Sequence, residues 1–214
     1  MLFETNDKTI VIDPYLSNSV EKINFKNRRR QAIDERFLKI RPDVLIFTHD
    51  HPDHYDEETV KHYFRENSKI LVLSPFSVWK EVKKFGGDNN YVMFNAGTQW
   101  SEGGVVFRAI DAEHSDDYAI GVLLEAEEKK YYITGDTLYN EKIFHIVPEG
   151  IYAIFLPING AGNNMNVADA KQFAERIRAE KVVPLHFGLF DSMTGEELHL
   201  NNKVVPMIYK EIEL

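Results

Sequence analysis

A cluster of metal-ligand side chains directly follows an apolar segment in the first quarter of the chain. Residues 48–55 read Thr-His-Asp-His-Pro-Asp-His-Tyr, so three of the eight histidines and two aspartates fall within six residues. Imidazole and carboxylate groups are the ligands of borderline divalent metals such as zinc. A polar turn that caps the next helix is the alternative interpretation, and the density of ligands favours metal. Three histidines cannot fill two metal shells, so the motif predicts further ligands elsewhere in the chain.

The composition fits one globular domain over residues 1–214 and argues against several other classes of protein. The chain is 43% hydrophobic and 28% charged, and its formal charge of −9 disfavours nucleic acid as a partner. One basic run, residues 26–30, leaves an anion-binding role open beside the alternative of a solvated surface. The absence of cysteine excludes disulfides and thiolate nucleophiles. No apolar stretch has membrane-spanning length and no secretory signal is visible, so we expect a cytoplasmic protein without membrane contact.

Hydrophobic patterning predicts strands and helices that alternate along one domain. The expected core strands are 9–12, 43–47, 69–73, 105–110, 120–124, 131–134, 151–156 and 181–185. The expected helices are 57–66, a segment from Ser74-Pro75 to Lys84, and one with Asn166 as its N-cap. Residues 17–40 are predicted to form a long connection with a short helix. Glu127-Glu128-Lys129 is predicted to close a hairpin.

Three further polar residues follow predicted strands. His114 comes after the strand 105–110, Asp136 after the strand 131–134, and His186 after the strand 181–185. A single histidine or aspartate at a strand end is usually structural. A rigid strand can, however, aim its terminal side chain at a shared point, so the combination with the cluster at 49–54 favours one metal site.

These residues together resemble the metallo-β-lactamase superfamily. His49, His51, Asp53 and His54 match its H-x-H-x-D-H motif, and His114, Asp136 and His186 match its later ligands. The resemblance implies an α+β fold, a four-layer αββα sandwich, with two divalent metal ions per chain. It implies that one metal is held by His49, His51 and His114, the other by Asp53, His54 and His186, with Asp136 bridging them. Zinc and manganese are the expected metals, and iron is disfavoured.

The resemblance also implies a dinuclear metal-dependent hydrolase that uses a metal-bound hydroxide on a small-molecule ester, lactone or phosphoester. Asp53 is the expected catalytic residue, because its carboxylate can ligate metal and accept a proton. Asp13 is the candidate outer partner of a metal-bound histidine, with a turn before Pro14 as its alternative role. Asn159 and Tyr15 are candidate substrate-binding residues, against the alternative of ordinary loop positions.

Residues 156–160 and 184–188 resemble the L-ascorbate-6-phosphate lactonase branch, which tends towards homo-oligomers. Residues 1–5 correspond to a stretch that a complete strand pair precedes in other members, so we expect the first edge strand to be missing. Two other functions stay open. One is a ribonuclease or phosphodiesterase of the same superfamily, and the other is a non-catalytic metal-binding scaffold.

Overall fold

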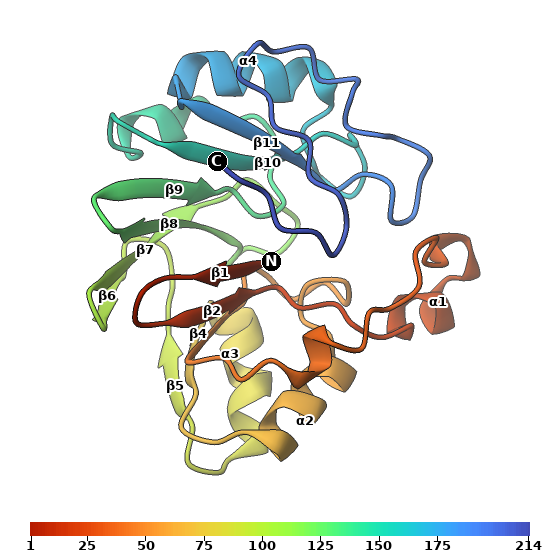
Figure 1. Cartoon of the computed structure of the whole chain (residues 1–214), viewed down its shortest axis with the longest axis vertical. Coiled ribbons are helices and arrows are strands. Elements are labelled where there is room, and N and C mark those ends of the chain that lie inside the picture. Colours follow the sequence, from red (N-terminus) through yellow and green to blue (C-terminus); the bar gives the residue numbers. More distant parts are fainter. The chain divides into compact units, whose positions relative to one another are not determined.

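The computed structural model describes residues 1–214 and divides them into two compact units, Met1–Asn95 and Ala96–Leu214. Each unit is built on one mixed β-sheet with its own helices, which agrees with the predicted α+β class (Figure 1). The prediction of a single domain stays a prediction. None of the helices combines the length and the apolar character that crossing a lipid bilayer requires.

The first unit contains a five-stranded sheet in the order β1-β2-β3-β4-β5. Its strands are β1 (Leu2–Glu4), β2 (Thr9–Ile12), β3 (Val44–Ile46), β4 (Leu71–Ser74) and β5 (Asn90–Met93). β1 forms an edge and pairs antiparallel with β2, whereas the other neighbours pair in parallel. All residues of β3 and β4 are buried, as their continuous apolar sequences predict.

Two helices cover this sheet, α2 (Glu57–Glu66) and α3 (Phe76–Val82), the latter extended by η3 (Lys83–Phe85). α2 begins at Asp56, whose carboxylate accepts a hydrogen bond from the backbone N–H of Glu58. The helix buries one stripe that includes Val60 and Tyr63, against core residues of β3 and β4. The connection from β2 to β3 contains α1 (Ser19–Ile23), η1 (Phe25–Asn27) and η2 (Phe37–Lys39).

The second unit contains a six-stranded sheet in the order β11-β10-β9-β8-β7-β6. Its strands are β6 (Gln99–Glu102), β7 (Val105–Asp111), β8 (Ile120–Ala126), β9 (Lys129–Ile133), β10 (Ala153–Pro157) and β11 (Lys181–Leu185). Pairing is antiparallel from β6 to β9 and parallel from β9 to β11. The short η4 (Glu141–His145) lies between β9 and β10.

Helix α4 (Val167–Ile177) packs on this second sheet. Asn166 is its N-cap as predicted, and its side-chain oxygen accepts hydrogen bonds from the backbone N–H groups of Ala168 and Asp169. Its buried face carries Ala170, Phe173 and Ala174, which join a core cluster with residues of β10 and β11. The helix ends at Arg178 in the left-handed conformation.

The predicted elements are largely confirmed. α2 and β11 have the predicted bounds, and the other predicted strands and helices occur within a few residues of their expected limits. The connection 17–40 contains one α-helix and two 3-10 turns, where one short helix was expected.

The hairpin between β8 and β9 closes through two residues, Glu127 and Glu128, which both have positive φ (52° and 63°). Two positive φ angles are typical of a type I′ turn, whose twist matches the two strands. Glutamate is poorly suited to this conformation because its Cβ approaches the following carbonyl oxygen. The strands therefore impose this turn on an unfavourable sequence.

Replacing Glu128 by glycine should stabilise the protein. Removing Cβ at φ 63° relieves the left-handed penalty, so we expect the free energy of unfolding to rise by about 1 kcal/mol. Urea denaturation followed by far-UV circular dichroism measures this change. Asp88→Gly is the matched control, because Asp88 is exposed and has no positive φ. An equal gain in both variants would contradict the explanation.

Candidate metal centre

In the first unit, the carboxyl ends of two parallel strands carry the predicted ligands. Asp13 directly follows β2, and the motif from His49 to His54 follows β3 after Phe47 and Thr48. β2 and β3 are parallel neighbours, so both segments leave the same edge of the sheet. The backbone N–H of Asp13 also donates to the carbonyl of Ile46 (3.0 Å), which joins the two strand ends.

The carboxylate of Asp13 organises this group of residues. Its Oδ1 accepts from the backbone N–H of Thr48 (2.8 Å), and its Oδ2 accepts from the Thr48 hydroxyl (2.5 Å). The same Oδ2 lies 2.8 Å from Nδ1 of His54. Asp13 has a φ of 47°, a left-handed conformation that is uncommon outside glycine. A strained aspartate with three such contacts is typical of a functional site.

These contacts select the tautomers of two histidines. A carboxylate only accepts, so Nδ1 of His54 carries the proton that points to Asp13. The Thr48 hydroxyl donates to Asp13 and therefore accepts from Nδ1 of His49, 3.0 Å away. Both neutral rings consequently present an Nε2 lone pair as a metal ligand. Ligand atoms of Asp13, His49 and His54 all lie within 4.8 Å of one another.

The remaining motif residues form a tight turn before α2. The carbonyl of His51 accepts from the backbone N–H groups of His54 (2.9 Å) and Tyr55 (2.8 Å). This turn brings the imidazole rings together, with centroids 4.7 Å apart for His49 and His51 and 4.0 Å apart for His49 and His54. Asp53 lies in the same turn and is partly exposed.

Tyr15 is held beside this group by a residue of the basic run. The guanidinium of Arg29 lies 4.3 Å from the centre of the Tyr15 ring, and its Nη2 donates to the Tyr15 carbonyl (2.6 Å). Burial raises the pKa of the Tyr15 hydroxyl above its usual value, against the opposing effect of Arg29, and the charges of Asp56 and Asp53 raise it further. The hydroxyl is therefore protonated at neutral pH and able to donate.

In the second unit, three parallel strands present predicted site residues at one edge. Asp136 follows β9, Asn159 follows β10 and His186 follows β11. Nε2 of His186 lies 3.1 Å from Oδ1 of Asp136, and its Nδ1 lies 3.1 Å from Nδ2 of Asn159. His186 has a φ of 57°, so it shares with Asp13 a left-handed backbone at a strand end.

Asp136 receives a second contact, from Asn164. The Asn164 side chain is buried, and its Nδ2 donates to Oδ2 of Asp136 (2.9 Å). The loop of His114 is tied to the Asp136 loop, because the backbone N–H of Glu113 donates to the Thr137 hydroxyl (3.0 Å). The second unit thus brings Asp136, His186 and Asn159 into direct contact and holds the His114 loop beside them.

The donor sets of both units suit borderline divalent cations, since they consist of imidazole and carboxylate groups. The fit is direct for His49 and His54, whose Nε2 atoms carry lone pairs. For His186, the Asn159 amide NH2 donates to Nδ1, so the proton of the neutral ring lies on Nε2. If the amide turns so that its oxygen faces Nδ1, the proton moves to Nδ1 and Nε2 can bind a cation. His114 differs, because its Nδ1 accepts from the backbone N–H of Asp116 (3.1 Å), so the neutral ring carries its proton on Nε2 in this arrangement.

Two residues of this centre were not assigned their roles from sequence. The sequence identifies Thr48 only as the first residue of the motif, whereas the structure shows that it links Asp13 to His49. Asn164 lies in an asparagine-rich loop at 163–166 and contacts Asp136. The position of Thr48 between a buried strand and a ligand is a local signal that favours such a link. Nothing in the sequence around Asn164 distinguishes it from Asn163.

Comparison with known proteins places the chain in a family. Residues 8–187 match the model of a beta-lactamase superfamily domain. A UPF0173 metal-dependent hydrolase of Geobacillus sp. (strain WCH70) is 31% identical over 200 residues, which cover 87% of this chain and 81% of the relative. A UPF0173 metal-dependent hydrolase of Flavobacterium johnsoniae is 30% identical over 203 residues, 89% and 81% of the two chains.

A solved structure described as a possible metal-dependent hydrolase from Veillonella parvula has the same fold. It superposes with a TM-score of 0.78 at 17% identity and covers all of this chain and 95% of its own. The predicted α+β class and metallo-β-lactamase fold are confirmed by this likeness and by the two mixed sheets. The chain belongs to the metallo-β-lactamase superfamily of hydrolases, in which its relatives are the UPF0173 metal-dependent hydrolases.

Proposed function

We propose that this chain is a dinuclear metal-dependent hydrolase of a small ester, lactone or phosphoester. The observation that carries the proposal is the Asp13–Thr48–His49–His54 network, because it prepares two Nε2 lone pairs within a family of metal-dependent hydrolases. Such a carboxylate–histidine arrangement is the usual outer partner of a metal ligand.

The assignment of ligands follows the family motif. One cation would take His49, His51 and His114, the other would take Asp53, His54 and His186, and Asp136 would bridge them. Cations bound by these residues would lower the pKa of a bound water and polarise the substrate oxygen that takes up negative charge. Zinc and manganese suit this set of nitrogen and oxygen donors.

Three side chains of the protein are assigned roles towards the water, the substrate and a ligand. Asp53 would orient the attacking water and accept its proton, as a carboxylate within reach can. Tyr15 keeps its proton at neutral pH and would donate to a substrate oxygen. Asn159 contacts His186, so we propose that it positions this ring in addition to lining the substrate pocket.

The ribonuclease alternative loses support from the basic run. Arg29 is turned inward onto Tyr15 and the Ser17 carbonyl, which leaves fewer cations of the run for phosphates. Only measured turnover of a substrate distinguishes the proposed hydrolase from a non-catalytic metal-binding scaffold.

The metal content and turnover of the purified chain test the proposal directly. Elemental analysis should find about two divalent cations per chain, and chelation should abolish hydrolysis of chromogenic esters, lactones and phosphodiesters until zinc or manganese is returned. Asp53→Ala should keep at least one cation and lower kcat at least about 100-fold. A protein that holds no metal, with none restorable, would falsify the proposal. Full metal with no turnover on any substrate class would favour the scaffold.

Replacing Asp13 by asparagine should weaken metal binding. An amide has one accepting oxygen, so its NH2 group would face either the backbone N–H of Thr48 or the protons of the Thr48 hydroxyl and His54, and we expect metal affinity to fall about 10–100-fold by calorimetric titration. Asp43→Asn is the matched control. Asp43 precedes β3 at the opposite end of the same strand pair, and its carboxylate accepts from the backbone N–H of Thr9 (2.8 Å). Equal losses in both variants would show that only the sheet was damaged.

The Asn159→Ala variant tests whether Asn159 positions His186 or only binds the substrate. If Asn159 orients His186, the variant loses about tenfold in metal affinity, and adding excess metal restores most of kcat. A raised KM with unchanged metal affinity would instead assign Asn159 to substrate alone. Ala161→Ser in the same loop should change neither quantity, because only the backbone of Ala161 contacts Asn159.

A further inference from the structure

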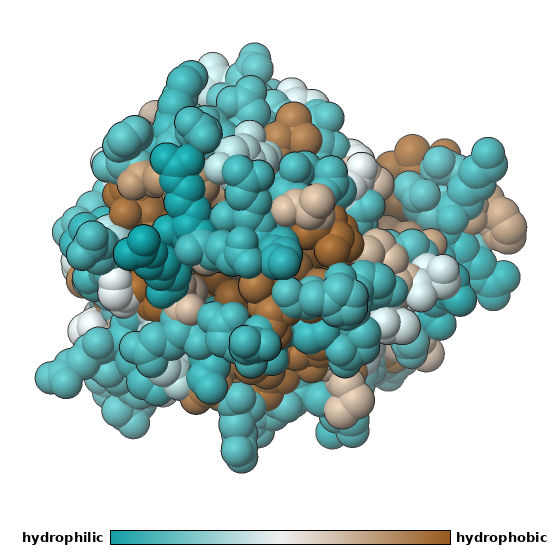
Figure 2. All heavy atoms as spheres, turned by 90° about the horizontal axis from the view of Figure 1, so that it is seen from above, coloured by the Kyte–Doolittle hydropathy of each residue, from teal (hydrophilic) through white to brown (hydrophobic).

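One asparagine of the second unit is buried beside a candidate ligand. Most of the surface seen in Figure 2 is hydrophilic, because polar side chains gain from contact with water. Asn164 is an exception, since it is only 4% exposed. Its Nδ2 donates to Oδ2 of Asp136 (2.9 Å). A polar side chain removed from water is stable only through its contacts, so the contacts of Asn164 indicate what it does.

The loop that carries Asn164 is closed at its base. It leaves β10 at Asn159, and an isolated β-bridge pairs Asn159 with Asn166, the N-cap of α4. The backbone N–H of Gly160 donates to the carbonyl of Met165 (3.1 Å). Gly160 has a φ of 65°, and a Cβ there would lie 3.0 Å from Cβ of Asn166, so this close approach requires glycine.

A further backbone hydrogen bond sets this loop against the loop of Asp136. The N–H of Met165, which follows Asn164, donates to the carbonyl of Thr137, which follows Asp136 (2.9 Å). The Thr137 hydroxyl accepts in turn from the backbone N–H of Glu113 (3.0 Å). Because these bonds involve no side chain of residue 164, we expect a substitution there to leave the path of the loop intact.

The amide of Asn164 has one possible orientation towards an ionised Asp136. A carboxylate only accepts hydrogen bonds, so the NH2 group faces it and the amide oxygen faces away. That oxygen is buried, and no protein group donates to it. In Asn140, Asn159 and Asn166, by contrast, Oδ1 accepts a backbone N–H. The Asn164 side chain therefore caps no helix and closes no turn, and its one hydrogen bond serves Asp136.

The same contact distinguishes the two oxygens of the Asp136 carboxylate. Oδ2 accepts from Asn164, whereas Oδ1 lies 3.1 Å from Nε2 of His186. Two donors at about 2.0–2.1 Å from one tetrahedral cation lie roughly 3.3 Å apart, which is close to this separation. The proton on Nε2 spans the gap in this arrangement, and a cation would take its place. Oδ1 is thus the oxygen spaced to share a cation with His186.

We propose that Asn164 is a positioning residue for Asp136, which it holds by Oδ2 so that Oδ1 meets the cation that His186 also binds. The inference rests on the proposed function, because it takes Asp136 and His186 as ligands. A carboxylate that is held in its binding orientation loses less freedom when the cation arrives. A leucine of similar size would avoid the unpaired amide oxygen, which lowers stability, but it could not hold the carboxylate.

Metal binding by Asn164→Leu tests the proposal without requiring turnover. Leucine is close to asparagine in size and donates no hydrogen bond, so the affinity of the full chain for Co²⁺ should fall about 10–100-fold by calorimetric titration. The visible spectrum of the cobalt-loaded protein should also change, because it depends on the geometry of the ligands. Asn164→Ala, which adds no bulk, must show the same two changes if the leucine variant does not fold.

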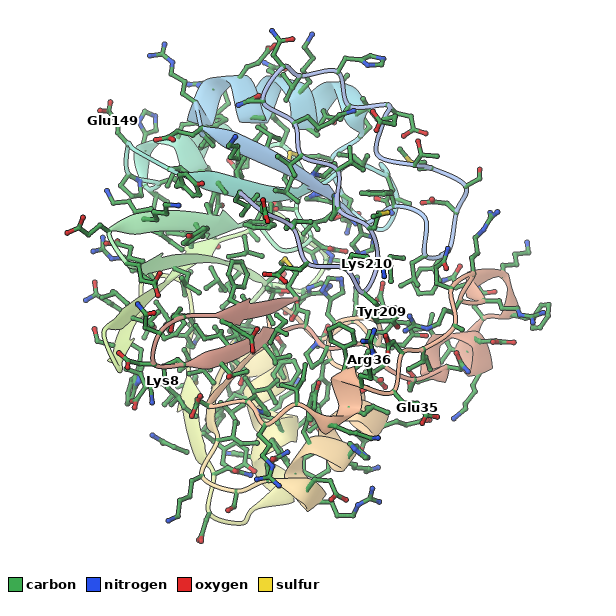
Figure 3. All side chains as sticks on the ribbon, viewed as in Figure 1. Lys8, Glu35, Arg36, Glu149, Tyr209 and Lys210 are labelled. Atoms are coloured by element: carbon green, nitrogen blue, oxygen red, sulfur yellow. The ribbon has the colours of Figure 1, made fainter.

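Asn166→Ala is the matched control from the same loop. Asn166 caps α4, so its loss should lower the urea midpoint of unfolding and leave the Co²⁺ affinity and spectrum unchanged. Glu149→Gln should change none of these quantities, since Glu149 is exposed on the connection before β10 (Figure 3). Equal losses of affinity in Asn164→Leu and Asn166→Ala would overturn the proposal, as would wild-type affinity and spectrum in Asn164→Leu.

Nuclear magnetic resonance of the ¹⁵N-labelled chain observes the amide itself. The side-chain NH2 signals that Asn164→Leu lacks belong to Asn164, and those that Asn163→Asp lacks belong to its exposed neighbour. Zinc should shift the Asn164 signals, because the carboxylate they contact binds the ion, and should leave those of Asn163 in place. Bound zinc without a shift at Asn164 would refute the proposal. A wild-type chain that binds metal but hydrolyses nothing would refute only the proposed hydrolase, and one that binds no metal would refute both.

Discussion

The hydrogen bonds accepted by the Asp13 carboxylate hold the first half of the candidate centre together. They join the ends of β2 and β3, fix the orientation of His54, and reach His49 through the Thr48 hydroxyl. A buried or partly buried carboxylate is stable only when such donors surround it. The left-handed backbone of Asp13 is the conformational cost of placing the carboxylate there.

In the second unit, amide side chains hold the candidate ligands in place. Asp136 is contacted by Asn164, and His186 by Asn159, while His186 itself adopts a left-handed backbone. Amides can turn to donate or accept, so they support a ligand in either protonation state, whereas the carboxylate of Asp13 enforces one tautomer. The two halves of the proposed centre therefore differ in rigidity, and the first is the better prepared for a cation.

Much of the fold was predictable because its signals are local. The periodicity of α2, the N-cap Asn166 and the continuous apolar runs of β3 and β10 each specify an element from a few adjacent residues. The turn at Glu127–Glu128 was predicted from its neighbours, and its unfavourable residues gave no sign of positive φ. The segment of α1 and η1 was less predictable, since these short helices have weak periodicity and the start of α1 depends on the distant Asp56 for its position.

The sequence by itself determined the chemistry of the candidate site, because ligand identity and spacing in the motif at 49–54 are properties of neighbouring residues. It also determined that the ligands leave strand ends. Only the tertiary structure decided which side chains support them, as the contacts of Asp13 with His54 and of Asn164 with Asp136 join residues 41 and 28 positions apart. Such pairs arise from parallel strand registers and loop paths, which are fixed by packing across each sheet and leave no local trace in the chain.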